Sequence, residues 1–348
     1  MKKKILFLVS GFICTALSFK AQDYHLSHYD VATLYLNPAL TGVYNGEKAD
    51  YKVTVDQRSQ WRALGVKPYL TTYLSYDMAS QIKGRAVGFG GYLINNNGGI
   101  GNFNTLTFMG SASYDILNAK KTTATTEASA RNKHLLTVGL QMGLFYRSTN
   151  PNALNYDVQY SLANNGGAFD QNISNNEVYN RSSIVRFDAN YGIYYKYLES
   201  GKKAHPYAGL SINHLTRPNE SLTGGNSHLP IKWVAFAGCE IKLDDKMDLV
   251  PRVLYMNQAK AYDFTSGFLF YYRLNENQTK VFGGFDYRWK DACIISVGLK
   301  HESYALRMSY DINTSYLKNY SRGRGAFEIS FVYIGQKGKP FLKSFSQF

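Results

Sequence analysis

The sequence predicts an all-β protein, a transmembrane antiparallel β-barrel of the outer-membrane type with about 14 strands. The first observation is a set of 10–13-residue segments that alternate apolar and polar side chains, which is the pattern of a strand that crosses a bilayer. The second is a composition with only 18% charged residues but 29 Tyr and 30 Gly. The third is an N-terminal export signal. A soluble β-sandwich or propeller is the alternative, but it would favour shorter strands and an internal repeat.

The N-terminus has the order of a secretory signal peptide. Three lysines at Lys2–Lys4 precede the apolar run Ile5–Phe19, and Ala21 offers a cleavage point before Gln22. The run is shorter than the roughly 20 apolar residues that a membrane-spanning helix needs. We therefore expect residues 1–21 to be removed during export to the bacterial outer membrane.

Residues 22–48 form an exported head without strand alternation. Within it, Asn37, Pro38 and Ala39 followed by Gly42 predict a turn, because proline fixes φ and glycine permits positive φ. The tyrosines and leucines of this head need cover. We expect it to fold back into the barrel and plug the lumen; the alternative is a periplasmic tail.

Residues 49–335 carry the strands of the predicted barrel. In Ile231–Leu243 the apolar residues share one face and the charged residues share the other, and Val185–Tyr197 repeats this pattern. An even strand number places both termini in the periplasm, so residues 336–348 are expected to be a periplasmic tail. The alternation predicts two sets of positions: lipid-facing Trp233, Tyr191, Phe285 and Tyr310, and lumen-facing Lys232, Arg186, Asp286 and Asp311.

The net charge of +14 comes from 39 basic and 25 acidic residues. Apart from the three lysines of the leader, the basic residues are dispersed and form no dense block, which argues against nucleic acid as a partner. A dispersed excess suits anionic outer-membrane lipid or an acidic protein. After removal of the leader only Cys239 and Cys293 remain, too few for a disulfide framework, and whether they pair stays open.

Several segments resemble one protein family: QDYHLSHYDVATLYLNPALTG in the head, DQRSQW at Asp56–Trp61, PYAGLSINHLTRP at Pro206–Pro218, and MSYDINTSYL with GRGAFEISFVY within Met308–Tyr333. They resemble the PorP/SprF family of type IX secretion system outer-membrane proteins from Bacteroidota. The resemblance implies a barrel of the type IX secretion and gliding machinery that helps secrete a surface protein and anchor it at the cell surface. Its implied partners are an adhesin-like protein with a type IX C-terminal signal domain and other components of the machinery.

Motifs for catalysis or cofactor binding are missing from the sequence. It has no G-x-S-x-G elbow, P-loop or paired-cysteine motif. His25 and His28 are close together, but no cluster of carboxylates or cysteines completes a metal site in the sequence. We therefore expect no enzymatic activity, no cofactor and no metal.

The outward loops contain the aromatic and arginine residues that dominate protein interfaces. The alternative is that the aromatic residues belong to the interfacial girdle and that the arginines pair with lipid headgroups. A second function also stays open, a plugged channel for small molecules that resembles fatty-acid-transporter barrels. The candidate partner-binding residues are Arg58, Trp61 and Arg62 in the first loop, Tyr156 and Tyr160 in the long tract, and Tyr316, Tyr320, Arg322 and Arg324 in the last loop.

Overall fold

The computed structural model describes residues 23–44, 49–64, 67–83, 85–117, 133–162, 167–177, 179–199, 201–274 and 279–336. The expected leader at 1–21 and nearly all of the expected tail at 336–348 lie outside these residues. Among the described residues, no helix has the length and apolar character to span a bilayer.

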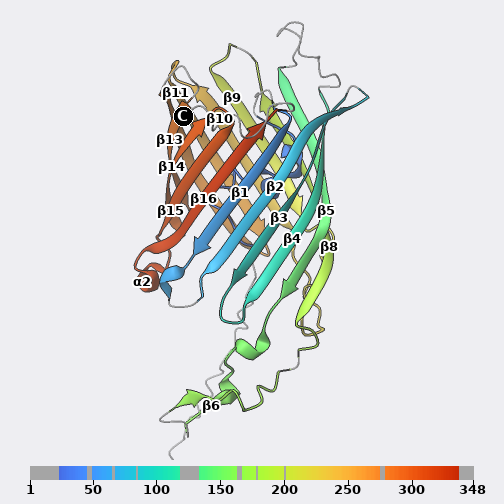
Figure 1. Ribbon diagram of the computed structural model, residues 1–348, viewed down its shortest axis with the longest axis vertical. Coiled ribbons are helices and arrows are strands. Elements are labelled where there is room, and N and C mark those ends of the chain that lie inside the picture. Colours follow the sequence, from blue (N-terminus) through green and yellow to red (C-terminus); the bar gives the residue numbers. More distant parts are fainter. Residues whose placement is uncertain are drawn as a thin grey trace, which may run out of the picture.

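Fourteen strands of the described chain pair antiparallel into one closed barrel (Figure 1). Each strand pairs with its neighbours in the chain, and β1 closes the barrel against β16. The predicted fold class and strand number are confirmed. The strands are β1 (Tyr51–Gln60), β2 (Tyr69–Ile82), β3 (Arg85–Gly98), β4 (Phe103–Asp115), β5 (His134–Ser148), β8 (Ser183–Tyr197), β9 (Ala204–Asn213), β10 (Lys232–Lys242), β11 (Met247–Gln258), β12 (Ala261–Arg273), β13 (Thr279–Arg288), β14 (Ala292–His301), β15 (Tyr304–Asn313) and β16 (Arg324–Gly335).

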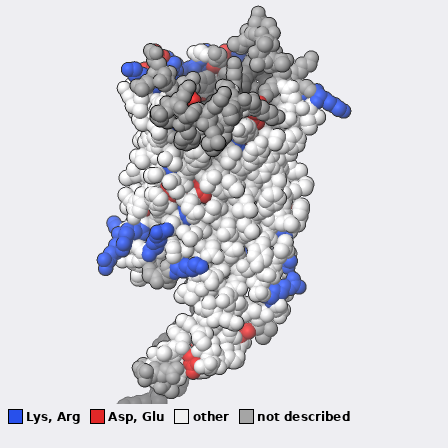
Figure 2. Space-filling view, in the orientation of Figure 1, with Lys and Arg blue, Asp and Glu red and all other residues white. Residues whose placement is uncertain are grey.

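The alternating pattern separates the two faces of the wall. Trp233, at 54% exposed, faces outward, while the preceding Lys232 is 4% exposed and faces the lumen. The other expected pairs follow the same alternation, with Arg186 half-buried. Lys and Arg side chains gather near the two ends of the barrel and are sparse across its middle on the face drawn in Figure 2. An apolar outer wall around a polar interior is the arrangement that a bilayer requires of a barrel.

The two ends of the barrel differ in their connections. One end, here the long-loop end, carries the connections 61–68, 149–182, 214–231 and 314–323. The opposite, short-turn end carries short connections such as Glu302–Ser303 and one longer connection, 116–133. Longer loops are extracellular in bacterial barrels. The long-loop end also holds the short elements η2 (Arg62–Leu64), η3 (Pro151–Ala153), η4 (Asp157–Gln159), β6 (Tyr160–Ser161), β7 (Ala168–Phe169) and α2 (Lys318–Ser321). The pair β6–β7 lies well beyond the barrel rim (Figure 1).

The head, described over residues 23–44, lies against the inner wall. It contains one helical turn, α1 (Thr33–Leu36), and one 3-10 turn, η1 (Pro38–Leu40), with Gly42 at a φ of +70°. Leu34 and Ala39 are fully buried. The wall accommodates this backbone at glycines: a Cβ on Gly139 would lie 2.3 Å from the Pro38 carbonyl carbon. Glycine inside a strand permits this close approach of a second backbone.

Two apolar clusters hold the head between opposite parts of the wall. The first joins head residues Leu36, Ala39 and Leu40 to wall residues of β8, β10 and β11. The second joins Leu26, Ala32 and Leu34 to wall residues of β2, β3 and β4. Cys239 and Cys293, left open above, are both free thiols.

Candidate functional site: the head, the lumen and the mouth cavity

A buried arginine of β1 joins the head to two strands. Arg58 donates at 2.8 Å to Asp311 of β15, at 2.8 Å to Glu328 of β16, and at 2.7 Å to the Ser27 hydroxyl of the head. Arg288 of β13 also donates to the Ser27 hydroxyl, at 3.0 Å. The placement of Arg58 in an outer loop is therefore wrong: the strand extends to residue 60, and Arg58 is 1% exposed inside the barrel.

A second ionic contact fixes the next turn of the head. Asp30 receives two hydrogen bonds from Arg307, at 2.7 and 2.9 Å, and lies 2.8 Å from a guanidinium nitrogen of Arg252. Arg252 in turn donates at 2.9 and 2.6 Å to Asp286. Burial raises the pKa of Asp30, but the two guanidinium groups outweigh it and hold this pKa well below its usual range. The head carboxylate is therefore ionised.

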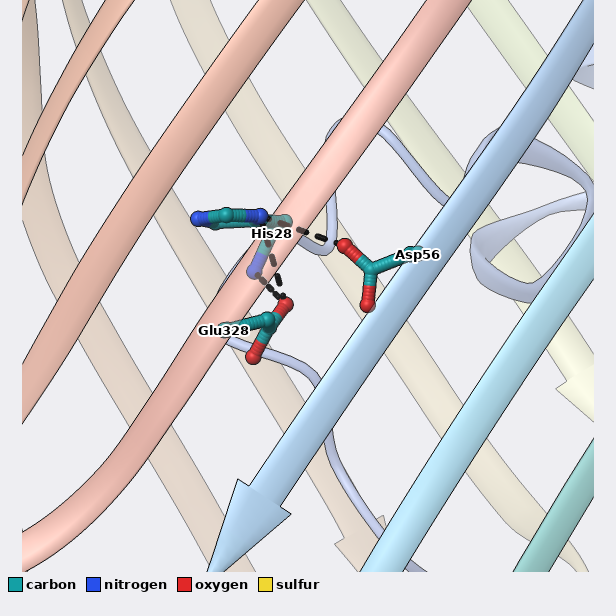
Figure 3. A group of neighbouring side chains, drawn as sticks. All are labelled: His28, Asp56 and Glu328. Atoms are coloured by element: carbon teal, nitrogen blue, oxygen red, sulfur yellow. Dashed lines mark hydrogen bonds and ion pairs between the residues drawn. The ribbon is translucent and has the colours of Figure 1, made fainter.

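His28 points one edge of its ring toward two wall carboxylates (Figure 3). Its Nδ1 is 3.2 Å from Asp56 and 3.6 Å from Glu328, while the far side of the ring points away from both acids. Burial lowers the pKa of His28 to about 4, against the opposing charge of Glu328. The imidazole is therefore neutral near pH 7, and its Nδ1 shares a hydrogen bond with Asp56.

The expectation that no carboxylate cluster accompanies the two histidines is wrong for His28, because Asp56 and Glu328, from strands remote in sequence, lie beside it. These three side chains are close enough together to hold a metal ion. However, Glu328 already accepts hydrogen bonds from the backbone N–H groups of Ser27 and His28 and from Arg58. The positive charge of Arg58, next to Glu328, repels a divalent metal ion. His28, Asp56 and Glu328 therefore fit a hydrogen-bonding role better than a metal site.

The other side of the head is held by uncharged groups. The Asn37 amide nitrogen donates to the carbonyls of Ile193 and Leu210, at 3.0 and 3.1 Å, and its oxygen accepts from Ala39 N–H at 2.8 Å. Wall side chains donate to four head carbonyls: Gln141 to Leu34, Ser211 to Leu36, Thr137 to Ala39 and Ser113 to Thr41. The buried backbone of the head thus finds its hydrogen-bond partners in the wall.

The first residue of the described head is fixed at the long-loop end. Both ring nitrogens of His214, just after β9, face carboxylates: Nε2 is 2.7 Å from Asp23 and Nδ1 is 2.5 Å from Asp188. Burial lowers the pKa of His214, but the two carboxylates outweigh it and raise the pKa to about 9. His214 is therefore an imidazolium that donates from both nitrogens near pH 7.

A cavity of about 380 Å³ lies between the start of the head and the long-loop end of the barrel. We call it the mouth cavity. Trp61 lines it and packs edge-on against Tyr69, with ring centroids 5.3 Å apart. Trp61 has a φ of +61°, which costs a bulky residue roughly 1–3 kcal/mol. In this backbone conformation the indole of Trp61 lies against the lumen. The sequence had suggested instead that Trp61 points outward from its loop to bind a partner.

The other candidate loop residues are divided among separate loops. Tyr156 is half-buried and hydrogen-bonds Tyr179, whereas Tyr160 is 50% exposed in β6. Tyr316 and Tyr320 are 88% and 71% exposed. Exposed basic residues gather where α2 packs against η2 and β16, the lower left of Figure 2; they are Arg62, Lys318, Arg322 and Arg324.

The closed wall, its apolar exterior and its polar lumen define an integral outer-membrane β-barrel protein. The family model described as type IX secretion system membrane protein PorP/SprF matches residues 18–333. The chain belongs to the PorP/SprF family, as its motifs predicted.

Solved structures with similar folds are themselves membrane barrels. The toluene transporter TbuX of Ralstonia pickettii matches with a TM-score of 0.51 and 11% identity, over 88% of this chain and 94% of that chain. The toluene transporter TodX of Pseudomonas putida matches with a TM-score of 0.44 and 10% identity, over 90% of this chain and 94% of that chain. At this identity the likeness to TbuX shows the fold alone. No curated protein sequence matches the chain.

Proposed function

We propose that this protein is a non-enzymatic component of the type IX secretion and gliding machinery that helps secrete a partner protein and anchors it at the cell surface. The partner is an adhesin-like protein, bound through its type IX C-terminal signal domain. Residues 1–21 serve as the cleaved leader, and residues 336–348 form a periplasmic tail beside other components of the machinery. Membership of the PorP/SprF family supports the secretion role.

The observation that carries the anchoring role is the apolar surface of the connection 149–182. Apolar side chains there are exposed beyond the barrel, outside the lipid-facing wall. Contiguous exposed apolar side chains on the water-facing part of a protein mark interaction sites. We call this surface the loop patch: Val158, Tyr160, Leu162, Phe169 and Ile173, which are 50%, 50%, 76%, 45% and 38% exposed.

The head supports an anchor rather than an open channel. Its hydrogen bonds and ion pairs reach strands around the barrel, including β1, β2, β4, β5, β8, β9, β11, β13, β15 and β16. We therefore propose that residues 22–48 plug the lumen. The wild-type protein in planar bilayers should show no steady ion conductance, and a steady conductance would favour the channel alternative.

The anchoring role is tested by a triple variant of the loop patch, Tyr160→Ser, Leu162→Ser and Phe169→Ser. All three side chains lie outside the barrel wall, so the variant should insert normally and retain its heat-modifiable migration on gels. Surface proteomics of the bacterium should show loss of a protein with a type IX C-terminal domain from the cell surface. A photo-cross-linking amino acid at position 162 of the otherwise wild-type chain should cross-link to that same protein.

The matched control is Tyr316→Ser with Tyr320→Ser, which removes two exposed aromatics from a different loop. We expect this control to retain the surface protein. Normal surface retention in a correctly inserted loop-patch variant contradicts the anchoring surface proposed here. Loss of the surface protein in the Tyr316→Ser, Tyr320→Ser control alone would place the anchor in the last loop, with its arginines.

A further inference from the structure

The mouth cavity is a candidate ligand site separate from the loop patch. It lies at the long-loop end of the lumen, between the first residues of the head and the ends of several strands. Its volume of about 380 Å³ falls within the range of small-molecule sites, roughly 300–1,000 Å³. The rings and apolar side chains in its lining include Tyr24, Tyr35, Trp61, Tyr92, Phe103 and Phe145.

These rings are held in fixed orientations. Tyr24 stacks on Tyr35 with centroids 5.6 Å apart, and Tyr92 meets Tyr35 edge-on at 6.1 Å. The Tyr35 hydroxyl donates to the backbone carbonyl of Tyr24 at 2.8 Å, which restrains the stacked pair. Prearranged aromatic faces and edges favour a planar ring as ligand, because offset and edge-on ring contacts add to the gain from apolar burial.

The charges that border the cavity compensate one another. Asp23 lies 2.7 Å from His214 and 3.4 Å from Lys232, and His214 also contacts Asp188. Arg147 pairs with Glu220. With His214 protonated, these three cations balance these three carboxylates. The cavity therefore offers an ionic ligand no free charge of opposite sign. Burying an ion without such a partner is costly, so an uncharged ligand is favoured.

Two buried polar atoms of the lining, Nε2 of His25 and Nε of Arg147, have no hydrogen-bond partner among the described residues. The guanidinium carbon of Arg147 is 5.3 Å from the ring centre of Phe103 and 5.6 Å from that of Phe145, so the group is bordered by rings. A hydroxyl or carbonyl oxygen on a ring-shaped ligand could accept a hydrogen bond from this N–H.

We propose that the mouth cavity binds a small, uncharged, planar ring compound that carries one hydroxyl or carbonyl group. The aromatic walls bind the ring, the compensated charges exclude ions, and Arg147 recognises the oxygen. This binding is independent of partner anchoring, because the loop patch lies beyond the barrel rim and its residues are absent from the lining of the cavity.

The test uses Trp61 as an internal reporter. The chain has 3 Trp, and the other two, Trp233 and Trp289, are 54% and 53% exposed on the barrel's outer side. The double variant Trp233→Phe, Trp289→Phe therefore keeps Trp61 as its one tryptophan. This reporter protein is placed in lipid nanodiscs and excited at the red edge of tryptophan absorption. It is titrated separately with p-cresol, p-toluenesulfonate and benzylammonium at pH 7. We expect a saturable emission change with p-cresol, and binding at least tenfold weaker for either charged probe.

Two variants in this background place the ligand. Thr105 is 7% exposed and lines the cavity, so Thr105→Phe should abolish the saturable response. Thr72, which alternates to the outer face of β2, provides the matched control, and Thr72→Phe should leave the response unchanged. This pair separates occupancy of the cavity from partitioning of p-cresol into lipid.

The hydrogen bond is tested without filling the cavity. In the reporter protein p-cresol should bind about tenfold more tightly than p-xylene, since a hydrogen bond to a charged donor is worth that much or more. Arg147→Met should remove this difference, and this comparison also decides the case if Thr105→Phe fails to insert. A non-saturable p-cresol response, tighter binding of a charged probe, or an unchanged p-cresol preference in Arg147→Met would each overturn the proposal.

Discussion

The two sides of the head are held in the lumen by different chemistry. On one side, Ser27, His28 and Asp30 meet charged groups of β1, β11, β13, β15 and β16. On the other side, residues 34–41 meet hydroxyls, amides, backbone carbonyls and glycines of β3, β4, β5, β8 and β9. The head therefore has a charged side and a neutral side within one lumen.

The two sides of the head therefore contribute differently: one fixes the orientation of the head, and the other its close fit to the wall. On the charged side, any other placement of the head would separate Asp30 from Arg307 and Arg252, and burying a charge without its partner is costly. On the neutral side, the backbone of residues 37–41 approaches wall glycines so closely that no Cβ would fit. We infer that the charged side fixes the register of the head, and that the neutral side depends on shape.

The largest effect is expected from Arg58→Ala on the charged side. The substitution removes the guanidinium that pairs with both Asp311 and Glu328, and breaking a buried pair in this way costs roughly 3–5 kcal/mol. Hydrogen-exchange mass spectrometry of the inserted protein should show a large loss of amide protection in residues 23–33.

The control is Arg324→Ala, which removes an exposed arginine from the start of β16. It should leave head protection unchanged. Equal protection of the head in Arg58→Ala and wild-type protein would show that the charged side does not hold it.

Much of the barrel could be predicted because strand alternation is a local signal. Each lipid-facing or lumen-facing assignment depends only on parity within one segment, as with Trp233 and Lys232. The exact end of a strand is less local. The sequence places Arg58 in the first loop, yet pairing with β2 and β16 extends β1 to Gln60.

The site itself depends on contacts between distant residues, and these could not be predicted from one sequence. His28 meets Glu328 from 300 positions away, and nothing near His28 in the chain indicates that carboxylate. A usable signal did exist: Asp56, Arg58, Asp311 and Glu328 occupy the lumen-facing parity of their strands. Buried charges of both signs require partners, so these positions predict an ion network inside the barrel without specifying its pairs.

A smaller effect is expected from Gly139→Ala on the neutral side. The new Cβ would lie 2.3 Å from the carbonyl carbon of Pro38 and 2.4 Å from the nitrogen of Ala39, so backbone must move, at a cost of roughly 1–3 kcal/mol. Protection should fall in residues 34–44 more than in residues 23–33. Gly283→Ala is the matched control, because its Cβ meets only a carbonyl oxygen at 3.9 Å. A uniform loss over the whole head would show that its two sides are not independent.

The smallest expected effect is a pH dependence of the contact between the head and His214. The pKa of His214 is raised to about 9 by Asp23 and Asp188 against the effect of burial. A raised pKa means that the ion pair contributes fully below the unfolded-state pKa of about 6.5 and is lost as the pH rises through about 9. Asp23 has a lowered pKa, so it remains ionised across this range. Lys232, 3.4 Å from Asp23, retains part of the attraction, so the contact between the head and the wall weakens without being lost. Exchange rates corrected for intrinsic pH dependence should therefore show protection of residues 23–28 falling between pH 6.5 and 9.5 in wild-type protein.

His214→Gln is the control for this pH dependence. It should show lower protection at pH 6.5 and little change up to pH 9.5. An equal decline in both proteins would assign the pH dependence to groups other than His214.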